Sequence, residues 1–234
     1  MKGKFYGVSV GPGDPEYMTL KAVRVIGTCP VLALPRTDGK NCVALDIARA
    51  AVDISGKEIL PLDFLMVRDA KQVRERHRQL TAMVCQRLAA GQDVAMLNLG
   101  DASLYASHSY IRRRVAAAGY QTETVAGVTS FCACAALLGV SLTRPRQPLH
   151  IIPGDYPGLE QELSTPGTKV IMKSGKGLER VKAALKDCGA GARARMVSNC
   201  GLPGQTVYHD ISEAEGGYFS TILVDGEREE GEQP

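Results

Sequence analysis

Three short stretches of this chain combine glycine with residues that can do chemistry, and each follows the end of an expected strand. They read G-P-G-D-P at 11–15, G-D-A-S at 100–103 and G-V-T-S at 127–130. Glycine lets a ligand approach the backbone closely, while a carboxylate and hydroxyls supply polar contacts. A carboxylate among such turns suits a ligand with a hydroxyl, ammonium or sulfonium group better than it suits a phosphate.

The residues around the first turn argue against a phosphate-binding site. The stretch is not G-x-G-x-x-G because residue 9 is serine, and Pro12 has no N–H group to donate to a phosphate. No Walker A sequence occurs, and the run 31–36 ends in proline and arginine where a dinucleotide fold would place an acidic residue. Two simpler roles remain open, in which Asp14 and Asp101 merely cap the helices that follow them.

Apolar runs and helical patterns alternate through the first half of the chain. The proline inside 57–64 predicts an edge strand, and the strongly apolar run 93–101 predicts a central parallel strand buried on both faces. This alternation predicts a parallel sheet with helices on its faces and a ligand-binding edge at the carboxyl ends of its strands. The expected strands are 5–11, 31–35, 57–64 and 93–101, and the expected helices include 41–52 and 69–90.

The pattern changes after Gly119. An alternating stretch at 120–127 leads into an apolar helix at 128–140, and a second helix carries Leu178, Val181 and Leu185 at helical spacing. We therefore expect an α/β protein of two α/β domains, residues 1–119 and 120–234. The further strands are expected at 149–154, 168–174, 192–198 and 218–224.

Composition excludes several classes of function. A net charge of +3 without a dense basic stretch argues against a nucleic-acid partner, and no apolar run approaches the length of a membrane span. The seven cysteines are irregularly spaced and include no C-x-x-C pair, so we expect structural thiols and no metal site. The chain is expected to be cytoplasmic, with no membrane partner.

The order and spacing of three motifs resemble the tetrapyrrole methylases. These motifs are VGPGDPEYMTLKAVRVI at 10–26, GDASLYAS at 100–107 and AGVTSFCACAALLGV at 126–140, and the resemblance runs from residue 5 to about residue 224. It implies a class III methyltransferase-like fold, a homodimer, and S-adenosylmethionine bound in a cleft between the two domains. The cofactor contacts that it implies are Pro12, Gly100, Asp101, Ser103, Thr129, Ser130 and Met172.

Within this family, the stretches 63–73, 99–115 and 127–142 are most similar to enzymes that methylate C20 of precorrin-2 in cobalamin synthesis. The resemblance therefore implies a tetrapyrrole substrate, precorrin-2 or cobalt-factor II. Uroporphyrinogen III, C11 or C17 of the corrin ring, a protein side chain or RNA remain open as acceptors, as does a nucleotide-binding module without activity. Ala102 stands where the family usually has proline, and 197–205 matches the family only in its LPGQ portion.

The reaction that this resemblance implies needs few catalytic groups from the protein. The methyl carbon of a sulfonium is already electrophilic, so alignment of donor and acceptor is the main requirement. Asp101 is the first candidate for a polar group near the reaction centre, and Lys173 for pairing with a substrate carboxylate. Tyr218 is a third catalytic candidate, with an ordinary strand-edge tyrosine as the alternative.

Three questions stay open at the level of sequence. They are whether the substrate carries cobalt, whether a base removes the proton from the methylated carbon, and which arginines line a trough for the substrate carboxylates. His108 follows the Asp101 turn and is a further candidate for mutation. The candidate arginines on loops are Arg36, Arg68, Arg144 and Arg146.

Overall fold

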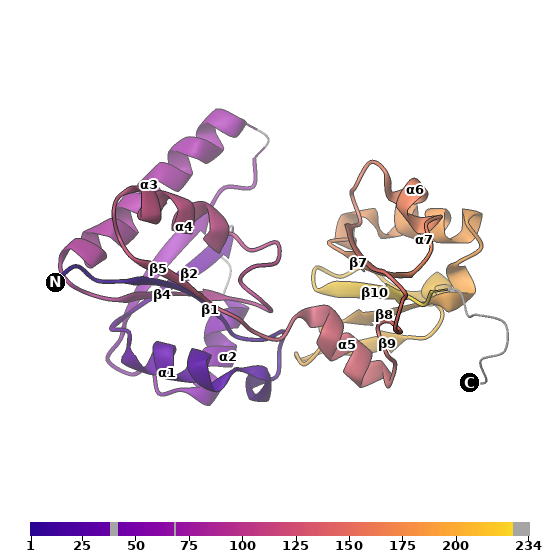
Figure 1. The fold of residues 1–234 in the computed structure, drawn as a ribbon, viewed down its shortest axis with the longest axis horizontal. Helices are drawn as coiled ribbons and strands as arrows, with labels where there is room; N and C mark the ends of the chain where they lie inside the picture. The colour runs from indigo at the N-terminus through magenta and orange to yellow at the C-terminus, as the bar shows by residue number, and fades with distance from the viewer. Residues whose placement is uncertain (38–41, 68, 227–234) are drawn as a thin grey trace. The chain divides into compact units, whose positions relative to one another are not determined.

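The computed structural model describes residues 1–37, 42–67 and 69–226. The chain forms two compact units, Met1–Thr129 and Ser130–Pro234 (Figure 1). The boundary follows Thr129 rather than residue 119, because strand β5 (Thr122–Val125) pairs with β1 (Phe5–Ser9) and so belongs to the first sheet.

The first unit contains a parallel sheet with the strand order β3-β2-β4-β1-β5. Its other strands are β2 (Val31–Thr37), β3 (Glu58–Phe64) and β4 (Val94–Asn98). Every residue of β4 is buried, as its apolar sequence predicts, and β3 with its proline is an edge strand. The strands expected in this half of the chain are therefore confirmed.

Helices cover both faces of this sheet (Figure 1). The pair α1 (Leu20–Thr28) and α2 (Val43–Ala51) lies on one face, and the pair α3 (Ala70–Ala89) and α4 (His108–Ala117) lies on the other. Asp69 begins α3 by accepting a hydrogen bond from Lys71 N at 2.8 Å. The apolar stripe of α3 then packs into a core that includes Phe5, Leu80, Val84, Leu88 and Met96.

Two details of the first unit differ from the simplest reading of its sequence. Asp14 caps only a single 3₁₀ turn, η1 (Pro15–Tyr17), and α1 begins afterwards with Thr19 as its cap. His77 lies on the charged side of α3 in sequence but is buried, because its ring stacks on Tyr110 of α4 at 4.9 Å between centroids. The contact between α3 and α4 therefore withdraws this histidine from solvent.

The second unit contains a mixed sheet with the order β6-β7-β10-β8-β9. Strands β6 (Leu149–Pro153) and β7 (Thr168–Met172) are parallel, and β10 (Ser220–Val224) runs antiparallel to β7 and to β8 (Ala194–Ser198). The four expected strands are confirmed. The short β9 (Thr206–Tyr208) is an unexpected fifth strand, and α6 (Leu159–Leu163) is an unexpected helix.

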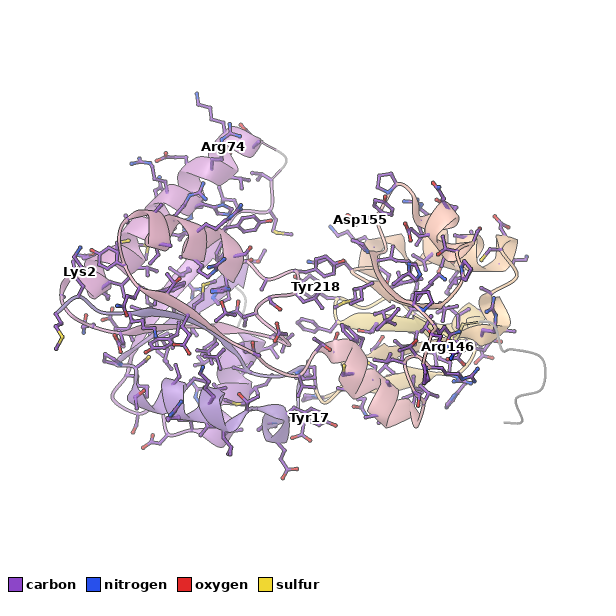
Figure 2. The ribbon with its side chains drawn as sticks, in the orientation of Figure 1. Lys2, Tyr17, Arg74, Arg146, Asp155 and Tyr218 are labelled. Atoms are coloured by element: carbon purple, nitrogen blue, oxygen red, sulfur yellow. The ribbon has the colours of Figure 1, made fainter. Side chains whose placement is uncertain are left out.

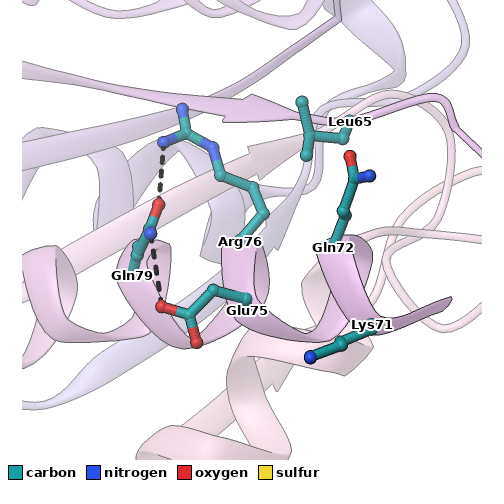
Figure 3. Close-up of a pocket in the computed structure, with 6 residues that line it drawn as sticks. All are labelled: Leu65, Lys71, Gln72, Glu75, Arg76 and Gln79. Carbon is teal, nitrogen blue, oxygen red and sulfur yellow. Dashed lines mark hydrogen bonds between the residues drawn. The ribbon is translucent and has the colours of Figure 1, made fainter. Parts of the chain in front are cut away.

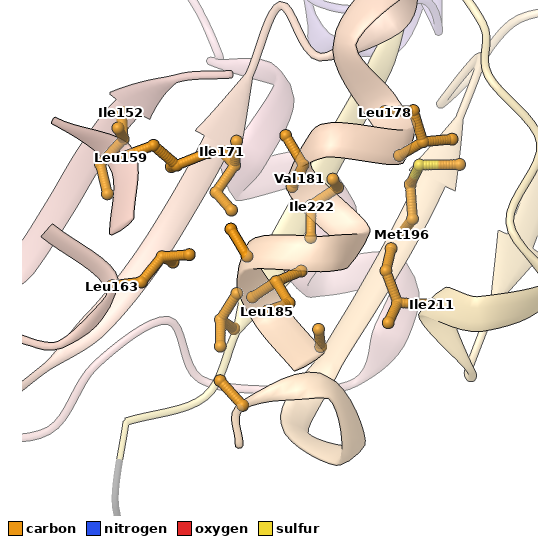
Figure 4. Packing of buried hydrophobic residues seen from close by; sticks show 14 of the residues in the cluster. Ile152, Leu159, Leu163, Ile171, Leu178, Val181, Leu185, Met196, Ile211 and Ile222 are labelled. Atoms are coloured by element: carbon orange, nitrogen blue, oxygen red, sulfur yellow. The ribbon is translucent and has the colours of Figure 1, made fainter. Parts of the chain in front are cut away.

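The second core lies between one face of this sheet and helices α6 and α7 (Leu178–Asp187) (Figure 4). Ile222 and Val224 of β10 point into it, together with Ile171 of β7. Helix α5 (Ser130–Leu138) also packs on β10. Its Ser130 Oγ lies 3.2 Å from Thr221 Oγ1, and Thr221 directly precedes Ile222, so its side chain points to the other face of the sheet. The further 3₁₀ turns are η2 (Gly175–Gly177), η3 (Gly191–Arg193) and η4 (Ile211–Glu213).

No helix within the described residues has both the length and the apolar character needed to cross a bilayer.

Candidate functional site

The three glycine turns of the first unit meet at the carboxyl edge of its sheet. Because β1, β4 and β5 are parallel neighbours, the chain leaves all three strands at this edge. The backbones of Gly11 and Gly100 pair directly: Gly100 N donates to Gly11 O at 2.7 Å, and Gly11 N donates to Gly100 O at 3.3 Å. Both glycines have positive φ, +75° and +69°, a conformation that favours glycine.

Asp101 connects two of these turns through its carboxylate. Oδ1 accepts hydrogen bonds from the backbone N–H of Ser103 at 2.7 Å and from the Ser103 hydroxyl. Oδ2 accepts from Gly127 N at 2.7 Å, across 26 residues of sequence. Burial raises the pKa of this carboxyl, but the hydrogen bonds from Ser103 and Gly127 outweigh burial and hold the pKa below its ordinary value.

This arrangement limits what Asp101 can do chemically. A carboxylate has about four lone-pair sites, and three of those on Asp101 already receive hydrogen bonds from the chain. A carboxyl with a lowered pKa is also a poor proton acceptor near neutral pH. Asp101 therefore orders the corner and keeps one lone pair for a ligand donor.

Gly127 closes the corner because it has no side chain. A Cβ atom at this position would lie 2.3 Å from Ser9 Cβ and 2.9 Å from Gly100 O. No side chain fits at these distances, so the β5 turn packs backbone-to-backbone against the β4 turn. The corner thus presents main-chain surface, which lets a ligand come close to the backbone.

His108, a candidate for mutation from its sequence position, has an unexpected place in this corner. The ring is buried and takes the space beside Gly7, where a Cβ would lie 2.1 Å from His108 Nε2. Its Nδ1 lies 3.4 Å from Ala102 O, beneath the Asp101 turn, and burial lowers the pKa of the imidazole. Gly7 was the available signal, because a glycine inside a strand often marks a close approach.

The other predicted residues of the first unit lie in or next to the same turns. Pro12 is buried directly after Gly11, and Ser103 is exposed while bound to Asp101. Thr129 Oγ1 is a buried atom without a hydrogen-bond partner among the described residues. Such an atom needs a partner, and a ligand hydroxyl or amine would satisfy it.

The predicted residues of the second unit gather at one edge of its own sheet. Met172 ends β7 and pairs with Thr221 of β10, whose hydroxyl contacts Ser130. Lys173 follows with a φ of +57°, and Tyr218 precedes β10 with 80% of its surface exposed (Figure 2). The structure therefore brings Ser130, Met172, Lys173 and Tyr218 to the same edge.

Ser174 adds a buried hydroxyl at this edge that the sequence analysis missed. It is fully buried, and its Oγ has no hydrogen-bond partner among the described residues. Glycine makes room for it: a Cβ on Gly154 would lie 2.8 Å from Ser174 Cα. Like Thr129 in the first unit, Ser174 is a polar group that a ligand could satisfy.

The candidate arginines have different surroundings. Arg36 Nε and Nη2 donate to the two carboxylate oxygens of Asp63 at 2.9 and 3.1 Å, which occupies its guanidinium with a protein partner. Arg144 and Arg146 lie on the connector before β6, where Arg146 has a φ of +73°. Arg68 lies outside the described residues.

A surface hollow of about 460 Å³ lies elsewhere, along the exposed side of α3 (Figure 3). It contains none of the predicted site residues, and it is lined by Leu65, Lys71, Gln72, Glu75, Arg76 and Gln79. Within the described part of the chain, no group of three or more His, Cys, Asp or Glu side chains is arranged to hold a metal ion.

Known proteins are similar in sequence over nearly the whole of this chain. A cobalt-precorrin-2 C(20)-methyltransferase of Salmonella typhimurium is 33% identical over 99% of this chain and 100% of that protein. A precorrin-2 C(20)-methyltransferase of Sinorhizobium is 29% identical over 96% of each chain.

Solved structures show the same fold at lower identity. A cobalt precorrin-4 methyltransferase, CbiF, superposes with a TM-score of 0.75 at 19% identity, covering 95% of this chain and 94% of that one. The uroporphyrin-III C-methyl transferase of Thermus thermophilus, complexed with S-adenosylhomocysteine, gives a TM-score of 0.70 at 22% identity, covering 95% and 92%. The model of one family, the tetrapyrrole (corrin/porphyrin) methylases, matches residues 4–215, and this chain belongs to that family.

Proposed function

We propose that this chain transfers a methyl group from S-adenosylmethionine to C20 of precorrin-2 or of its cobalt-bearing counterpart. The observation that carries the proposal is full-length similarity to two proteins named for this reaction. A precorrin-4 C(11)-methyltransferase of Pseudomonas aeruginosa is 32% identical, but over only 60% of this chain and 49% of that protein. The C11 position is therefore the less supported acceptor.

The corner of the first unit fits the chemistry of this cofactor. Glycines let its turns pack closely together. The carboxylate of Asp101 complements the cationic groups of the cofactor by its negative charge, or accepts hydrogen bonds from the cofactor's hydroxyls. The Thr129 hydroxyl, buried without a partner among the described residues, is ready for a second polar contact. A phosphate-bearing cofactor would instead be repelled by the negative charge of Asp101, and Pro12 has no N–H group to donate to it.

The work left to the chain is binding and orientation. When bound, S-adenosylmethionine supplies an electrophilic methyl group. Gly100, Asp101 and Ser103 hold the cofactor in place, and alignment alone can contribute about 7–11 kcal/mol to lowering a barrier. We assign Lys173 to a carboxylate of the tetrapyrrole and Tyr218 to the substrate surface. Asp101 acts by charge and position, since its carboxylate stays ionised.

Calorimetric titration with S-adenosylhomocysteine tests the cofactor site. We expect the unmodified chain to bind it and to ignore NAD and ATP, and we expect Asp101→Ala to weaken binding by about 1–3 kcal/mol. Asp69→Ala is a matched control, because Asp69 also caps backbone N–H groups but does so at the start of α3. Equal affinity in the Asp101 variant and the unmodified chain would contradict the assignment.

The reaction itself is tested by product analysis. The chain is incubated with ¹³C-methyl-labelled S-adenosylmethionine and either metal-free or cobalt-loaded dipyrrocorphin, and NMR locates the new methyl group. We expect labelling of C20, while labelling of another ring carbon would move the proposal to that position. The expected homodimer and cytoplasmic location remain predictions, which light scattering and cell fractionation test.

A further inference from the structure

We propose that Ser9 is a positioning residue for the cofactor corner. Its hydroxyl fixes the Asp101 turn against the end of β5. The part of the proposal that concerns the cofactor rests on the function proposed above. The part that concerns the geometry of the corner stands on hydrogen bonds within the first unit.

The Ser9 hydroxyl joins two segments that are distant in sequence. Ser9 is the last residue of β1 and is completely buried. Its Oγ donates to Val125 O at 2.6 Å and accepts from Ala102 N at 2.9 Å. Since β1 lies between β4 and β5, this single hydroxyl connects the exits of both neighbouring strands.

These two segments are the same ones that Asp101 connects. Ala102 follows Asp101, and Val125 stands two residues before Gly127, whose N–H donates to Asp101 Oδ2 at 2.7 Å. A hydrogen bond of that length requires the two turns to keep a fixed separation. The Ser9 hydroxyl connects the same two segments from within the sheet. Its Cβ also forms part of the surface on which Gly127 packs.

Asn98 is a further buried polar side chain at this edge, but it plays a different part. Asn98 ends β4, and its Nδ2 donates to Met96 O at 2.8 Å within its own strand and to Val8 O at 3.5 Å. It therefore stays within the sheet, while Ser9 reaches the turns beyond it. Because Ser9 is buried, it acts on a ligand only through the residues that it holds.

Removal of the hydroxyl should disturb the corner selectively. Ser9→Ala leaves Ala102 N–H and Val125 C=O buried without their side-chain partner, so both turns can move. Thr81→Ala is the matched control, because Thr81 is also buried and its hydroxyl donates to His77 O at 2.7 Å within α3. Both variants lose a buried hydroxyl of the first unit, but only the Ser9 hydroxyl contacts the corner.

Two measurements separate positioning from general destabilisation. Hydrogen exchange of the amides at 100–103 and 125–127 should accelerate in Ser9→Ala and stay unchanged in Thr81→Ala. The Kd for S-adenosylhomocysteine should rise about tenfold in Ser9→Ala, equivalent to about 1.4 kcal/mol, and stay within about twofold in Thr81→Ala. Unchanged exchange at the corner, or a Kd within about twofold in Ser9→Ala, overturns the proposal.

A second substitution offers a test by rescue. Leu104 N donates to Asp101 O at 3.2 Å, which places Ala102 at the second position of a four-residue turn, where proline is favoured. Proline has no N–H, so Ser9→Ala combined with Ala102→Pro leaves no amide in need of the lost hydroxyl. The double variant should bind S-adenosylhomocysteine more tightly than Ser9→Ala alone, and weaker or equal binding overturns the proposal.

Two further outcomes are distinguishable. If the unmodified chain does not bind S-adenosylhomocysteine, the proposed function fails, while exchange at the corner still decides the role of Ser9. If Ser9→Ala does not fold, the Ala102 amide of the unmodified chain decides it. That amide should exchange as slowly as the amides inside β4, and rapid exchange overturns the proposal.

Discussion

Replacing Asp101 with asparagine tests whether the corner depends on a carboxylate. Asparagine keeps one acceptor oxygen, which can retain the two hydrogen bonds from Ser103. Its amide nitrogen then faces Gly127 N–H, donor against donor, where Oδ2 now accepts at 2.7 Å. Loss of a hydrogen bond to a charged group costs about 1.5–3 kcal/mol, and an unpaired buried N–H adds to it. We expect the first unit to lose about 2–4 kcal/mol of its free energy of unfolding.

Hydrogen exchange of amides in β1 and β4 measures this loss for the first unit alone, because the two units need not unfold together. Asp69→Asn is the control, since asparagine caps a helix as well as aspartate does and Asp69 is exposed, so a smaller loss is expected. The pKa of Asp101 is lowered in the folded state, so its contribution is present at neutral pH and fades as pH falls through that folded pKa. The difference between the two proteins should shrink accordingly. A loss below about 1 kcal/mol at neutral pH would refute the reasoning.

Two further predictions concern the packing and titration of the first unit. Gly127→Ala should cost about 1–3 kcal/mol of stability by overpacking. Gly27→Ala in α1 should instead gain about 0.5–1 kcal/mol, because its Cβ would lie 3.9 Å from Val52 Cγ1, an ordinary contact distance. Equal effects of the two substitutions in denaturant unfolding would contradict the described contacts. Burial lowers the pKa of both His77 and His108, so the unfolded chain binds more protons below the ordinary histidine pKa of about 6.5, and stability should rise with pH up to that value. His77→Phe, which keeps an aromatic ring between its neighbours, should flatten that rise, and an unchanged slope would count against the buried histidine.

Much of the architecture was predictable because burial leaves a local signal. The proline within β3 indicated an edge strand, and the unbroken apolar sequence of β4 indicated a centre. Short elements gave no such signal: β9 has three residues and α6 has five, which is too short for a hydrophobic pattern to repeat recognisably. The boundary lies after Thr129 rather than near residue 119 because β5 pairs with β1, which lies far from it in sequence.

The meeting of the candidate turns was predictable from the sequence, but the hydrogen bonds that connect them were not. Glycines at strand ends marked all three turns, and two of these glycines, Gly11 and Gly100, pair directly. Nothing local marks the hydrogen bond from Gly127 to Asp101, because the two residues come together only through strand order. The hydrogen bond from Ala102 to Ser9 has no local signal either. In the sequence, Ser9 shows only that the stretch does not match a nucleotide-binding motif.

The order of strands in the first sheet also bears on how the chain is made. Phe5 of β1 pairs with Val94 of β4 and with Thr122 of β5, so both neighbours of this strand are synthesised long after it. A ribosome adds about 5–20 residues per second, which leaves the apolar segment 5–10 waiting for seconds on the nascent polypeptide. Until both neighbours have formed, the apolar side chains of this segment lack their partners in the sheet, and the first unit cannot close before Asp101 and Gly127 have left the exit tunnel.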